Sequence, residues 1–221
     1  PMLILILVLA VFGALIPGFF GAGSLTNLAR QWGEFGLIVL ALTVVMAAGG
    51  IDLSVGSIFA LGNIVALALI GLVELPVPLV MLLTVACGAA VGLVNGLLVG
   101  YLRLRAFLTT LVTLIIVRAA VDMLLLKYAV AIASTFPDSD LWYWFGEGAF
   151  LSLPVSVVVT LVVALVIHLT LSRARLGWQV LAVGGSRRSA HNVGIPVRRV
   201  ICLTYVTSGA LAALAGFLFA S

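Results

Sequence analysis

Long apolar runs alternate with short polar stretches along the whole chain. Such runs predict membrane-spanning helices, because about 20 mostly apolar residues are needed to cross the hydrocarbon core of a bilayer. Seven segments meet or approach this length: 1–20, 35–49, 56–73, 77–100, 107–126, 153–171 and 200–220. The second would reach only about 22 Å at 1.5 Å per residue, so we expect it to extend into residues 30–34 or to stop inside the membrane. The predicted fold class is an all-α, polytopic membrane helix bundle.

The composition excludes an ordinary soluble globule. Of the 221 residues, 64% are hydrophobic and 8% are charged, and the mean hydropathy is +1.38. Soluble domains are about 45 to 50% apolar and about 25% charged. The chain begins at Pro1 and ends at Ser221 directly after an apolar run. We therefore interpret residues 1–221 as a single transmembrane domain that is truncated at both ends.

The net charge of +4 is distributed as in a membrane protein. Residues 172–199 contain six arginines and no acid, whereas residues 127–152 carry a net charge of −2. Because basic residues collect in cytoplasmic loops, residues 172–199 are predicted to be cytoplasmic. The connector 101–106, with two arginines, then falls on the same side two segments earlier. This topology explains the positive charge better than nucleic-acid binding does.

Residues 49–56, with the sequence Gly-Gly-Ile-Asp-Leu-Ser-Val-Gly, interrupt the apolar pattern and predict a helix break. Counting segments back from the cytoplasmic loop puts this break towards the cytoplasmic side. A charged side chain at a helix centre costs about 2.5 to 3.5 kcal/mol on insertion scales, so Asp52 either lies near an aqueous surface or has a partner. Paired glycines free the backbone, and Asp52 or Ser54 can cap a new helix. We expect Asp52 to act mainly in folding, with a role in a polar pathway through the membrane as the alternative.

Other polar residues lie within the predicted segments. The candidates for a substrate pathway are Asp52, Ser54, Asn63, Asn95, Thr110, Thr113 and Arg118. For Asn63 and Asn95 an interhelical hydrogen bond is favoured over a lining of the pathway. Arg118 and Asp122 stand four residues apart, so they can meet on one helix face. We expect this pair to neutralise itself near the outer surface, and the functional alternative is an arginine that faces a polar channel.

Two segments carry small residues at every fourth position. These residues are Gly88, Gly92, Gly96 and Gly100 in segment 77–100, and Ser208, Ala212, Gly216 and Ala220 in segment 200–220. Faces of this kind allow two membrane helices to approach closely. The pattern predicts either a compact bundle or a subunit interface, without choosing between them.

The remaining reactive or aromatic residues favour no catalytic or metal site. Residues 142–144, Trp-Tyr-Trp, are typical of an interfacial aromatic belt, which is favoured over a sugar-stacking platform. Cys87 and Cys202 have no CxxC partner or nearby histidine, so we expect neither a disulfide framework nor zinc. The chain has no GxxxxGK[ST] motif, and neither His168 nor His191 has a paired base or nucleophile. We therefore expect no catalytic residue, metal or cofactor, and no ATP site in this chain.

The run GGIDLSVGS at residues 49–57 resembles the signature of the permease subunits of bacterial ATP-binding cassette sugar importers. That family contains ribose, xylose, arabinose and galactose permeases. A second family pattern, PxFIxTLGTxxxxRG, is matched in part by Phe107, Thr110, Leu111, Thr113 and Arg118. Its proline and both glycines are replaced here by Ala106, Val112 and Ala119.

The cytoplasmic loop has the punctuation of a small helix outside the membrane, near residues 186–194. The pair Gly184-Gly185 predicts a turn, Ser186 can cap a helix through His191, and Gly194 with Pro196 can end it. In the family that the chain resembles, this position holds the coupling helix that docks on the ATPase. The coupling residues carried over by the match are Gly184, Gly185, Ala190, Gly194 and Ile195.

The resemblance implies a multi-pass inner-membrane permease that translocates a monosaccharide by alternating access. It implies four partners outside this chain: an ATPase subunit that binds the ATP, a second permease subunit in a homo- or heterodimer, a periplasmic sugar-binding protein and the lipid bilayer. An ion-coupled secondary transporter is the alternative, because its broken helices and midplane charges also fit the element around Asp52. A channel comes third. Uptake that survives ATP depletion but collapses with the ion gradient would favour the secondary transporter.

Overall fold

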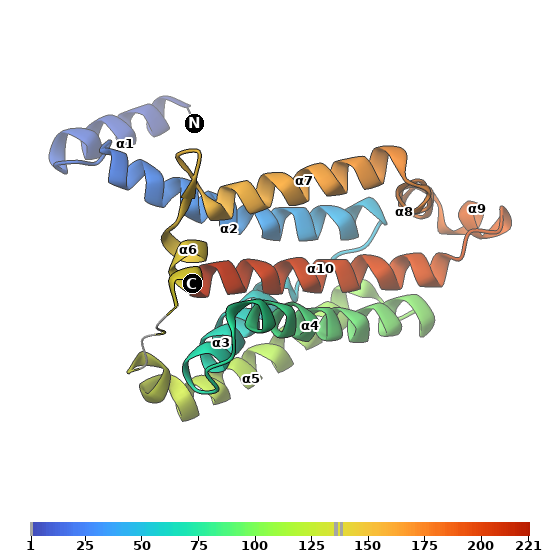
Figure 1. Ribbon diagram of the computed structural model, residues 1–221. Coiled ribbons are helices and arrows are strands. Elements are labelled where there is room, and N and C mark those ends of the chain that lie inside the picture. Colours follow the sequence, from blue (N-terminus) through green and yellow to red (C-terminus); the bar gives the residue numbers. More distant parts are fainter. Residues whose placement is uncertain (1, 135–136, 138) are drawn as a thin grey trace.

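The computed structural model describes residues 2–134, 137 and 139–221, and it is a helical bundle (Figure 1). The elements are α1 (Met2–Leu15), α2 (Ala22–Ala47), α3 (Val55–Gly71), α4 (Val77–Gly96), the π-helical turn η1 (Leu97–Tyr101), α5 (Ala106–Ala133), α6 (Asp140–Glu147), β1 (Ala149–Phe150), β2 (Leu153–Pro154), α7 (Val155–Arg173), α8 (Arg175–Gly185), α9 (Arg187–Asn192) and α10 (Val197–Ala220). β1 and β2 form a small antiparallel hairpin. The predicted all-α class is confirmed.

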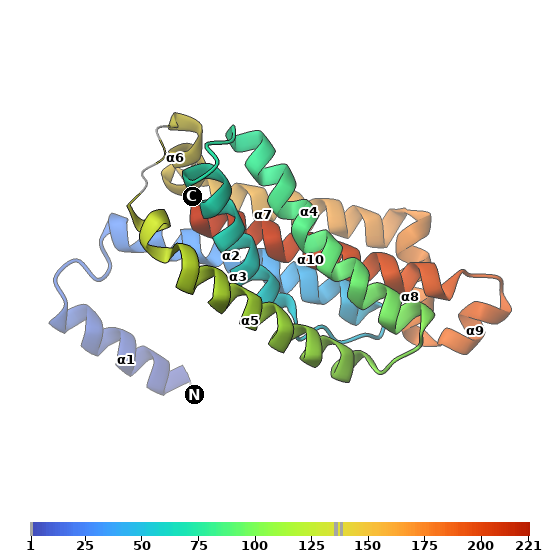
Figure 2. The ribbon, with the colours of Figure 1, turned by 90° about the horizontal axis from the view of Figure 1, so that it is seen from below.

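Five helices among the described residues are long and apolar enough to cross a membrane: α2, α4 with η1, α5, α7 and α10. The other two predicted segments also form helices, but α1 has 14 residues and α3 has 17. α2 already begins at Ala22. The expectation that the second segment extends towards the N-terminus is therefore confirmed. α1 lies to one side of the bundle, and its described side chains are almost all exposed (Figure 2).

The two ends of the bundle differ in charge. α8, α9 and the connector between η1 and α5 lie at one end, which we call the basic end, and α6 lies at the other (Figure 1). The arginines of these basic-end segments, of the last turn of α7 and of the first turn of α10 are Arg103, Arg105, Arg173, Arg175, Arg187, Arg188, Arg198 and Arg199. The two arginine-containing loops lie at the same end of the bundle, as predicted. The positive-inside rule predicts that this end faces the cytoplasm.

The glycine stripe of α4 packs along α10. A Cβ atom added at Gly88, Gly92, Gly96 or Gly100 would meet, in that order, backbone atoms of Gly209, Tyr205, Cys202 and Arg198. Without side chains on this face, the two helices approach to backbone contact, which maximises dispersion attraction where lipid supplies no hydrophobic drive. The stripe therefore builds this bundle rather than a subunit interface.

The predicted stripe of small residues on α10 packs against a different helix, α3. A Cβ atom at Gly216 would meet the carbonyl oxygen of Phe59, and Ala212 lies in a buried cluster with Ile58. α10 therefore has small residues towards α3 as well as towards α4. This explains why 72% of its most apolar stretch is buried, against 33% or less in the other four spans among the described residues.

α6 was not predicted as a helix, and it corrects the prediction of an aromatic belt. Trp142 is 3% exposed and packs edge-to-face on Phe217 at the end of α10, with ring centroids 5.6 Å apart. The Ser139 hydroxyl caps α6 by accepting a hydrogen bond from the Trp142 amide. Trp142 is thus a core residue, because the amphipathic helix turns it inwards, whereas Tyr143 and Trp144 remain exposed.

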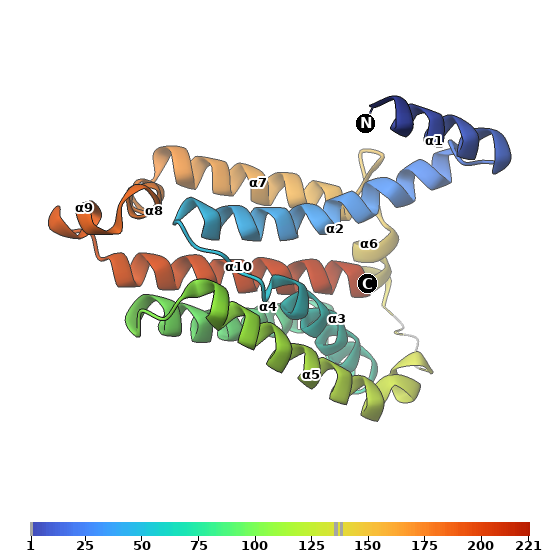
Figure 3. The ribbon, with the colours of Figure 1, turned by 180° about the vertical axis from the view of Figure 1, so that it is seen from behind.

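The helix break takes the chain back into the bundle. α2 ends at Ala47, Gly49 adopts a left-handed conformation with φ +69, and residues 50–54 are not helical. Figure 3 shows this segment returning from the basic end to the interior, where α3 begins. The predicted position towards the cytoplasmic side is therefore correct for Gly49 and wrong for Asp52, which lies deeper. The return is possible because glycine tolerates the left-handed turn.

Candidate functional site

The Asp52 carboxylate is buried beside the middle of α10 and is 2% exposed. The Ser208 hydroxyl of α10 donates to its Oδ2 atom at 2.9 Å. Ser54 donates to its Oδ1 atom twice, from the backbone amide at 3.0 Å and from the hydroxyl at 2.6 Å. Ser208 stands halfway along α10, about 17 Å from either end at 1.5 Å per residue. Three neutral donors therefore satisfy a carboxylate that the membrane interior would otherwise disfavour.

Two further side chains extend this arrangement across the bundle. The Asn95 amide of α4 donates to the Ser54 hydroxyl at 2.9 Å, and the Thr113 hydroxyl of α5 donates to the Asn95 carbonyl at 2.6 Å. Each donor in this series points towards Asp52, so the hydrogen bonds polarise one another in the same direction. We call Asp52, Ser54, Asn95, Thr113 and Ser208 the polar network. The interhelical hydrogen bond predicted for Asn95 is confirmed.

Capping of α3 differs from the prediction. Ser54 occupies the N-cap position, but its side chain makes no capping hydrogen bond to the helix. Its hydroxyl donates to Asp52 instead, and Asp52 in turn accepts from the Ser54 amide, which precedes the first helical residue, Val55. Asp52 therefore stabilises the turn before the helix rather than the first amides of the helix.

Three predicted pathway residues lie outside the polar network. Thr110 is buried and donates to the Ala106 carbonyl of its own helix at 2.9 Å. Asn63 makes no side-chain hydrogen bond to the described part of the chain. Arg118 and Asp122 form the predicted ion pair, at 3.3 Å, with side chains 61% and 54% exposed. Arg118 lies about 18 Å along α5 from the basic end. The expected position of the pair near the outer surface stays a prediction.

The segment predicted to be cytoplasmic forms two helices, α8 and α9. Gly184 and Gly185 are the last residues of α8, so the turn predicted at these glycines is wrong. The chain turns one residue later, at Ser186, whose hydroxyl accepts from the Ser189 amide at 3.2 Å and caps α9 as predicted. Gly194 follows α9 with φ +82. We call residues 175–195, which include both helices, the coupling segment.

The coupling segment contacts the start of the helix break. A Cβ atom added at Gly184 would meet the carbonyl oxygen of Ala47 and the amide of Gly49, so the two backbones are already in contact. Arg187 donates to the Gly49 carbonyl at 3.4 Å. Two residues further along, the Tyr205 hydroxyl of α10 donates to the Ile51 carbonyl at 2.9 Å. Residues of α8, α9 and α10 therefore all contact the segment that leads to Asp52.

Apolar contacts attach α9 to the bundle. Ala190 is 3% exposed and belongs to a buried cluster with Val183, Val200 and Tyr205. Ile195 packs against the same cluster. These two predicted coupling residues anchor the segment, because their side chains are inside while the polar residues of α9 remain exposed. α9 is thereby packed against residues of α8 and α10.

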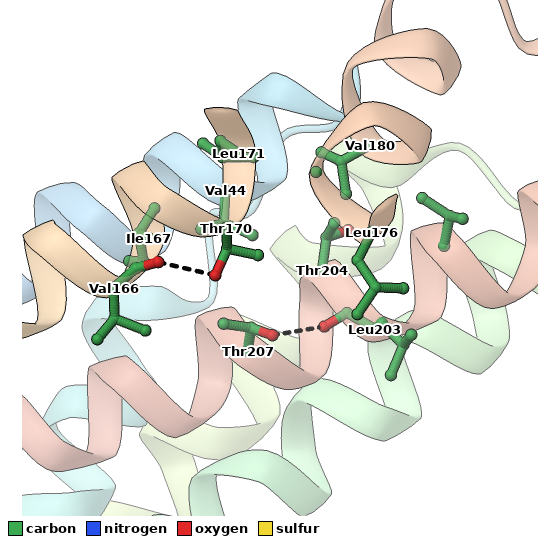
Figure 4. A pocket seen from close by; sticks show the side chains of 12 residues that line it. Val44, Val166, Ile167, Thr170, Leu171, Leu176, Val180, Leu203, Thr204 and Thr207 are labelled. Carbon is green, nitrogen blue, oxygen red and sulfur yellow. Dashed lines mark hydrogen bonds between the residues drawn. The ribbon is translucent and has the colours of Figure 1, made fainter. Parts of the chain in front are cut away.

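A cavity of about 260 Å³ lies between α2, α7, α8 and α10, and its chemistry is apolar. Figure 4 shows Thr170 and Thr207 among its lining residues. Their hydroxyls donate to the Val166 and Leu203 carbonyls of their own helices, and the Thr204 hydroxyl donates to Ile201 in the same way. A sugar needs several convergent polar partners, which this cavity does not offer.

Sequence reasoning missed three features of the site. Ser208 was predicted only as a small packing residue, and Tyr205 was not singled out. Nothing local indicates either role, because each partner lies more than 150 positions away along the chain. The third is Glu34, which is 4% exposed and has an Oε2 atom without a hydrogen-bond partner in the described residues. The sequence could have indicated Glu34, because it is an acid in a largely apolar helix and stands four residues after Arg30.

Known proteins similar to this chain are transport permeases. Residues 24–221 match the family described as "Branched-chain amino acid transport system / permease component". The ribose import permease protein of Escherichia coli K12 is 33% identical over 214 residues, which cover 97% of this chain and 66% of that protein. The galactofuranose transporter permease protein of the same strain is 33% identical over 225 residues, which cover 98% of this chain and 64% of that protein.

A third relative is the D-allose transport system permease protein of the same strain, 33% identical over 221 residues, which cover 96% of this chain and 64% of that protein. The chain thus spans about two thirds of the length of these relatives. No solved structure gives a significant match. With its five apolar helices among the described residues, the chain is a multi-pass protein of the inner membrane, and it belongs to this family of transport permease components.

Proposed function

We propose that this chain is the membrane-spanning subunit of an ATP-driven importer that moves a monosaccharide across the inner membrane by alternating access. The family description names branched-chain amino acids, but the relatives that match almost the whole chain are named for ribose, galactofuranose and D-allose. These names support a sugar as the substrate class. Nothing in the comparisons favours the ion-coupled alternative.

The observation that carries the proposal is the backbone contact between Gly184 of the coupling segment and the end of α2. An ATPase that docks on α8 and α9 from the cytoplasm would move Gly184. Because the backbones of Gly184 and Ala47 already touch, the start of the helix break has to move with it. The break leads within a few residues to Asp52, which is hydrogen-bonded to Ser208 of α10. ATP-driven motion at the basic end thus reaches the middle of the membrane.

The polar network is proposed to be a positioning element rather than the sugar-binding surface. Asp52, Ser54, Asn95 and Ser208 are each 0 to 2% exposed, and their polar atoms bond one another. In this arrangement they offer no free group to a solute. The network joins the break to α4, α5 and α10, so these parts move together when the pathway opens to one side or the other.

The solute pathway is proposed to run along the exposed face of α5. Arg118 and Asp122 are more than half exposed on this face, within the span. Intramembrane charges of this kind almost always face a protein interior or a water-filled cavity, because contact with lipid is costly. A guanidinium and a carboxylate both form charge-assisted hydrogen bonds to sugar hydroxyls. The proposed partners are an ATPase at the basic end, a second permease subunit, and a periplasmic binding protein at the α6 end.

Uptake by the whole transporter tests the energy source and the substrate class. Cells that express it with its ATPase are given labelled ribose, galactofuranose, allose or a branched-chain amino acid. We expect uptake of one of the sugars, lost on ATP depletion and retained when an ionophore collapses ion gradients. Uptake that follows the ion gradient, or that is confined to an amino acid, would contradict the proposal.

Two adjacent glycines provide a matched test of the coupling contact. Gly184→Leu places a side chain against the Ala47 carbonyl, whereas a Cβ atom at Gly185 would have open space. We expect Gly184→Leu to lower uptake at least tenfold while ATP hydrolysis by the assembled transporter continues. Gly185→Leu should leave uptake within about twofold. Equal effects of the two substitutions would show that the contact does not transmit motion.

The orientation has its own test in a Cys87→Ala/Cys202→Ala background. Ser189 and Glu74 are both exposed, at opposite ends of the bundle. An impermeant thiol reagent added to intact spheroplasts should label Glu74→Cys and spare Ser189→Cys, and inside-out vesicles should reverse the pattern. Labelling of Ser189→Cys from outside would remove the basis for an ATPase at the basic end.

A further inference from the structure

A groove at the basic end gathers arginines from three segments. One cavity of about 340 Å³ lies between η1, α9 and α10, and its basic lining is Arg103, Arg187, Arg188, Arg198 and His191. A second cavity of about 440 Å³ shares His191 and Arg198 with the first and adds Arg199. We call the two connected cavities the arginine groove. It is distinct from the buried polar network and from the α5 face.

The positive charge of the groove is not balanced within the described part of the chain. No acid lines either cavity, and the one ion pair among the described residues is Arg118–Asp122 on α5. Arginine remains charged at every physiological pH. Five arginines line the two cavities. Their positive charges repel one another, and an anion bound among them would relieve that repulsion.

The floor of the groove is apolar and lies beside the membrane. Val99 and Ile201 line it and are 2% and 4% exposed. They belong to the cytoplasmic ends of η1 and α10, next to Leu102 and Leu104, which are 66% and 49% exposed. The groove therefore combines arginines with apolar residues at the basic ends of two helices that are long and apolar enough to cross a membrane.

We propose that the arginine groove binds the phosphate headgroup of an anionic phospholipid from the cytoplasmic leaflet. Arginine pairs with phosphate oxygens through two parallel hydrogen bonds, and basic pockets between spans on the cytoplasmic side suit anionic headgroups. The exposed side chains of Leu102 and Leu104 beside the groove favour a lipid over inorganic phosphate, because they offer an acyl chain a contact that a free ion lacks. Such a lipid would join α9, α10 and η1, the elements that meet at the base of the coupling segment.

Binding of phosphatidylglycerol to the purified full chain tests the proposal. The chain is placed in phosphatidylcholine nanodiscs with increasing fractions of phosphatidylglycerol, and the lipid that remains bound is counted by native mass spectrometry. The groove variant is Arg187→Gln/Arg188→Gln/Arg198→Gln. The control variant, Arg105→Gln/Arg173→Gln/Arg175→Gln, removes the same charge from the same end but outside the groove.

We expect the groove variant to bind phosphatidylglycerol roughly 100-fold more weakly, because it removes three arginines that would hydrogen-bond the phosphate, at about fivefold each. The control should stay within about fivefold of the wild type. Arg187→Lys/Arg188→Lys/Arg198→Lys keeps the charge but removes the planar guanidinium groups. Its affinity for phosphatidylglycerol should therefore lie between those of the groove variant and the control variant. That variant also separates loss of the site from loss of the fold.

Three results would overturn the proposal. An equal loss in the groove and control variants would mean diffuse attraction to the surface. Inorganic phosphate or glycerol phosphate that competes as well as the lipid would assign the groove to a soluble anion. Unchanged lipid binding in the groove variant, together with lost binding of the ATPase subunit, would assign it to acidic side chains of that partner.

Discussion

Two aspartates, one in the helix break and one within α5, obtain their partners in different ways. Asp52 is 2% exposed and accepts hydrogen bonds from Ser54 and from Ser208, which is 156 positions away. Asp122 is 54% exposed and pairs with Arg118, one turn away on the same helix. The Asp122 pair needs only an α-helix to form. The Asp52 arrangement exists only when the break, α4 and α10 are assembled, so it reports on the fold of the whole bundle.

This difference predicts that Asp52 contributes mainly to stability and Asp122 mainly to transport. Loss of Asp52 leaves several buried donors without an acceptor, and each unsatisfied donor carries a desolvation cost of about 1 to 3 kcal/mol. Loss of Asp122 leaves an exposed arginine, and exposed ion pairs contribute about 0 to 1 kcal/mol. Substitutions in the polar network should therefore act first on folding, and substitutions in the α5 pair should act first on the solute.

Asp52→Ala should have the largest effect on stability. It removes the acceptor for Ser208 and for both donors of Ser54, so we expect the free energy of unfolding to fall by about 3 kcal/mol. Unfolding in mixed micelles with increasing sodium dodecyl sulfate measures this change. Asp122→Ala is the matched control and should cost less than about 1 kcal/mol. Similar losses for the two variants would remove the contrast between the aspartates.

Asn95→Ala should follow in size. It removes the hydrogen bonds to Ser54 and from Thr113, and hydrogen bonds between membrane helices contribute about 0.6 kcal/mol on average and up to about 1.7. We expect a loss of about 1.5 kcal/mol in the same assay. Asn63→Ala provides the control, because Asn63 makes no side-chain hydrogen bond to the described residues. It should change stability by less than about 0.5 kcal/mol.

Ser208→Ala should have a smaller effect, of about 1 kcal/mol. It removes one donor to Asp52 but leaves both donors of Ser54 in place. Thr207→Ala, one position away, removes only a hydroxyl that bonds the Leu203 carbonyl of its own helix. Stability that falls as far in Thr207→Ala as in Ser208→Ala would show that helix packing, rather than the carboxylate, sets the cost.

The Arg118–Asp122 pair should have the smallest effect on stability. A double-mutant cycle with Arg118→Gln and Asp122→Asn should give a coupling energy below about 1 kcal/mol, since more than half of each side chain is exposed. Sugar uptake by the assembled transporter should nevertheless fall at least tenfold in each single variant. Normal uptake in both variants, or a coupling energy above about 2 kcal/mol, would argue against a water-filled pathway along α5.

Much of the architecture could be predicted from local patterns. Apolar runs predicted the helices, because crossing a bilayer requires a minimum length whatever the neighbours are. The spacing of Gly88, Gly92, Gly96 and Gly100 predicted a close-packed face, and the spacing of Arg118 and Asp122 predicted their ion pair. Each of these inferences needs only the geometry of a single helix.

The errors fall where a distant segment decides the outcome. α8 continues through Gly184 and Gly185, and Gly184 is needed for contact with Ala47 rather than for a turn. Trp142 is buried because Phe217 lies beneath α6. Asp52 lies in the interior because the Ser208 hydroxyl donates a hydrogen bond to its carboxylate there. A residue's own neighbours in the chain contain no information about such partners.

The sequence by itself determined that this protein is a membrane helix bundle, which of its ends is basic, and where its helices are interrupted. These properties follow from hydropathy, charge and backbone freedom, which are local. Only the tertiary structure decided that α4 and α3 pack on different faces of α10, that the coupling segment touches the helix break, and that Asp52 is satisfied by neutral donors. The physical reason is that hydrogen bonds and backbone contacts depend on distances of a few ångströms, and packing sets those distances between segments far apart in the chain.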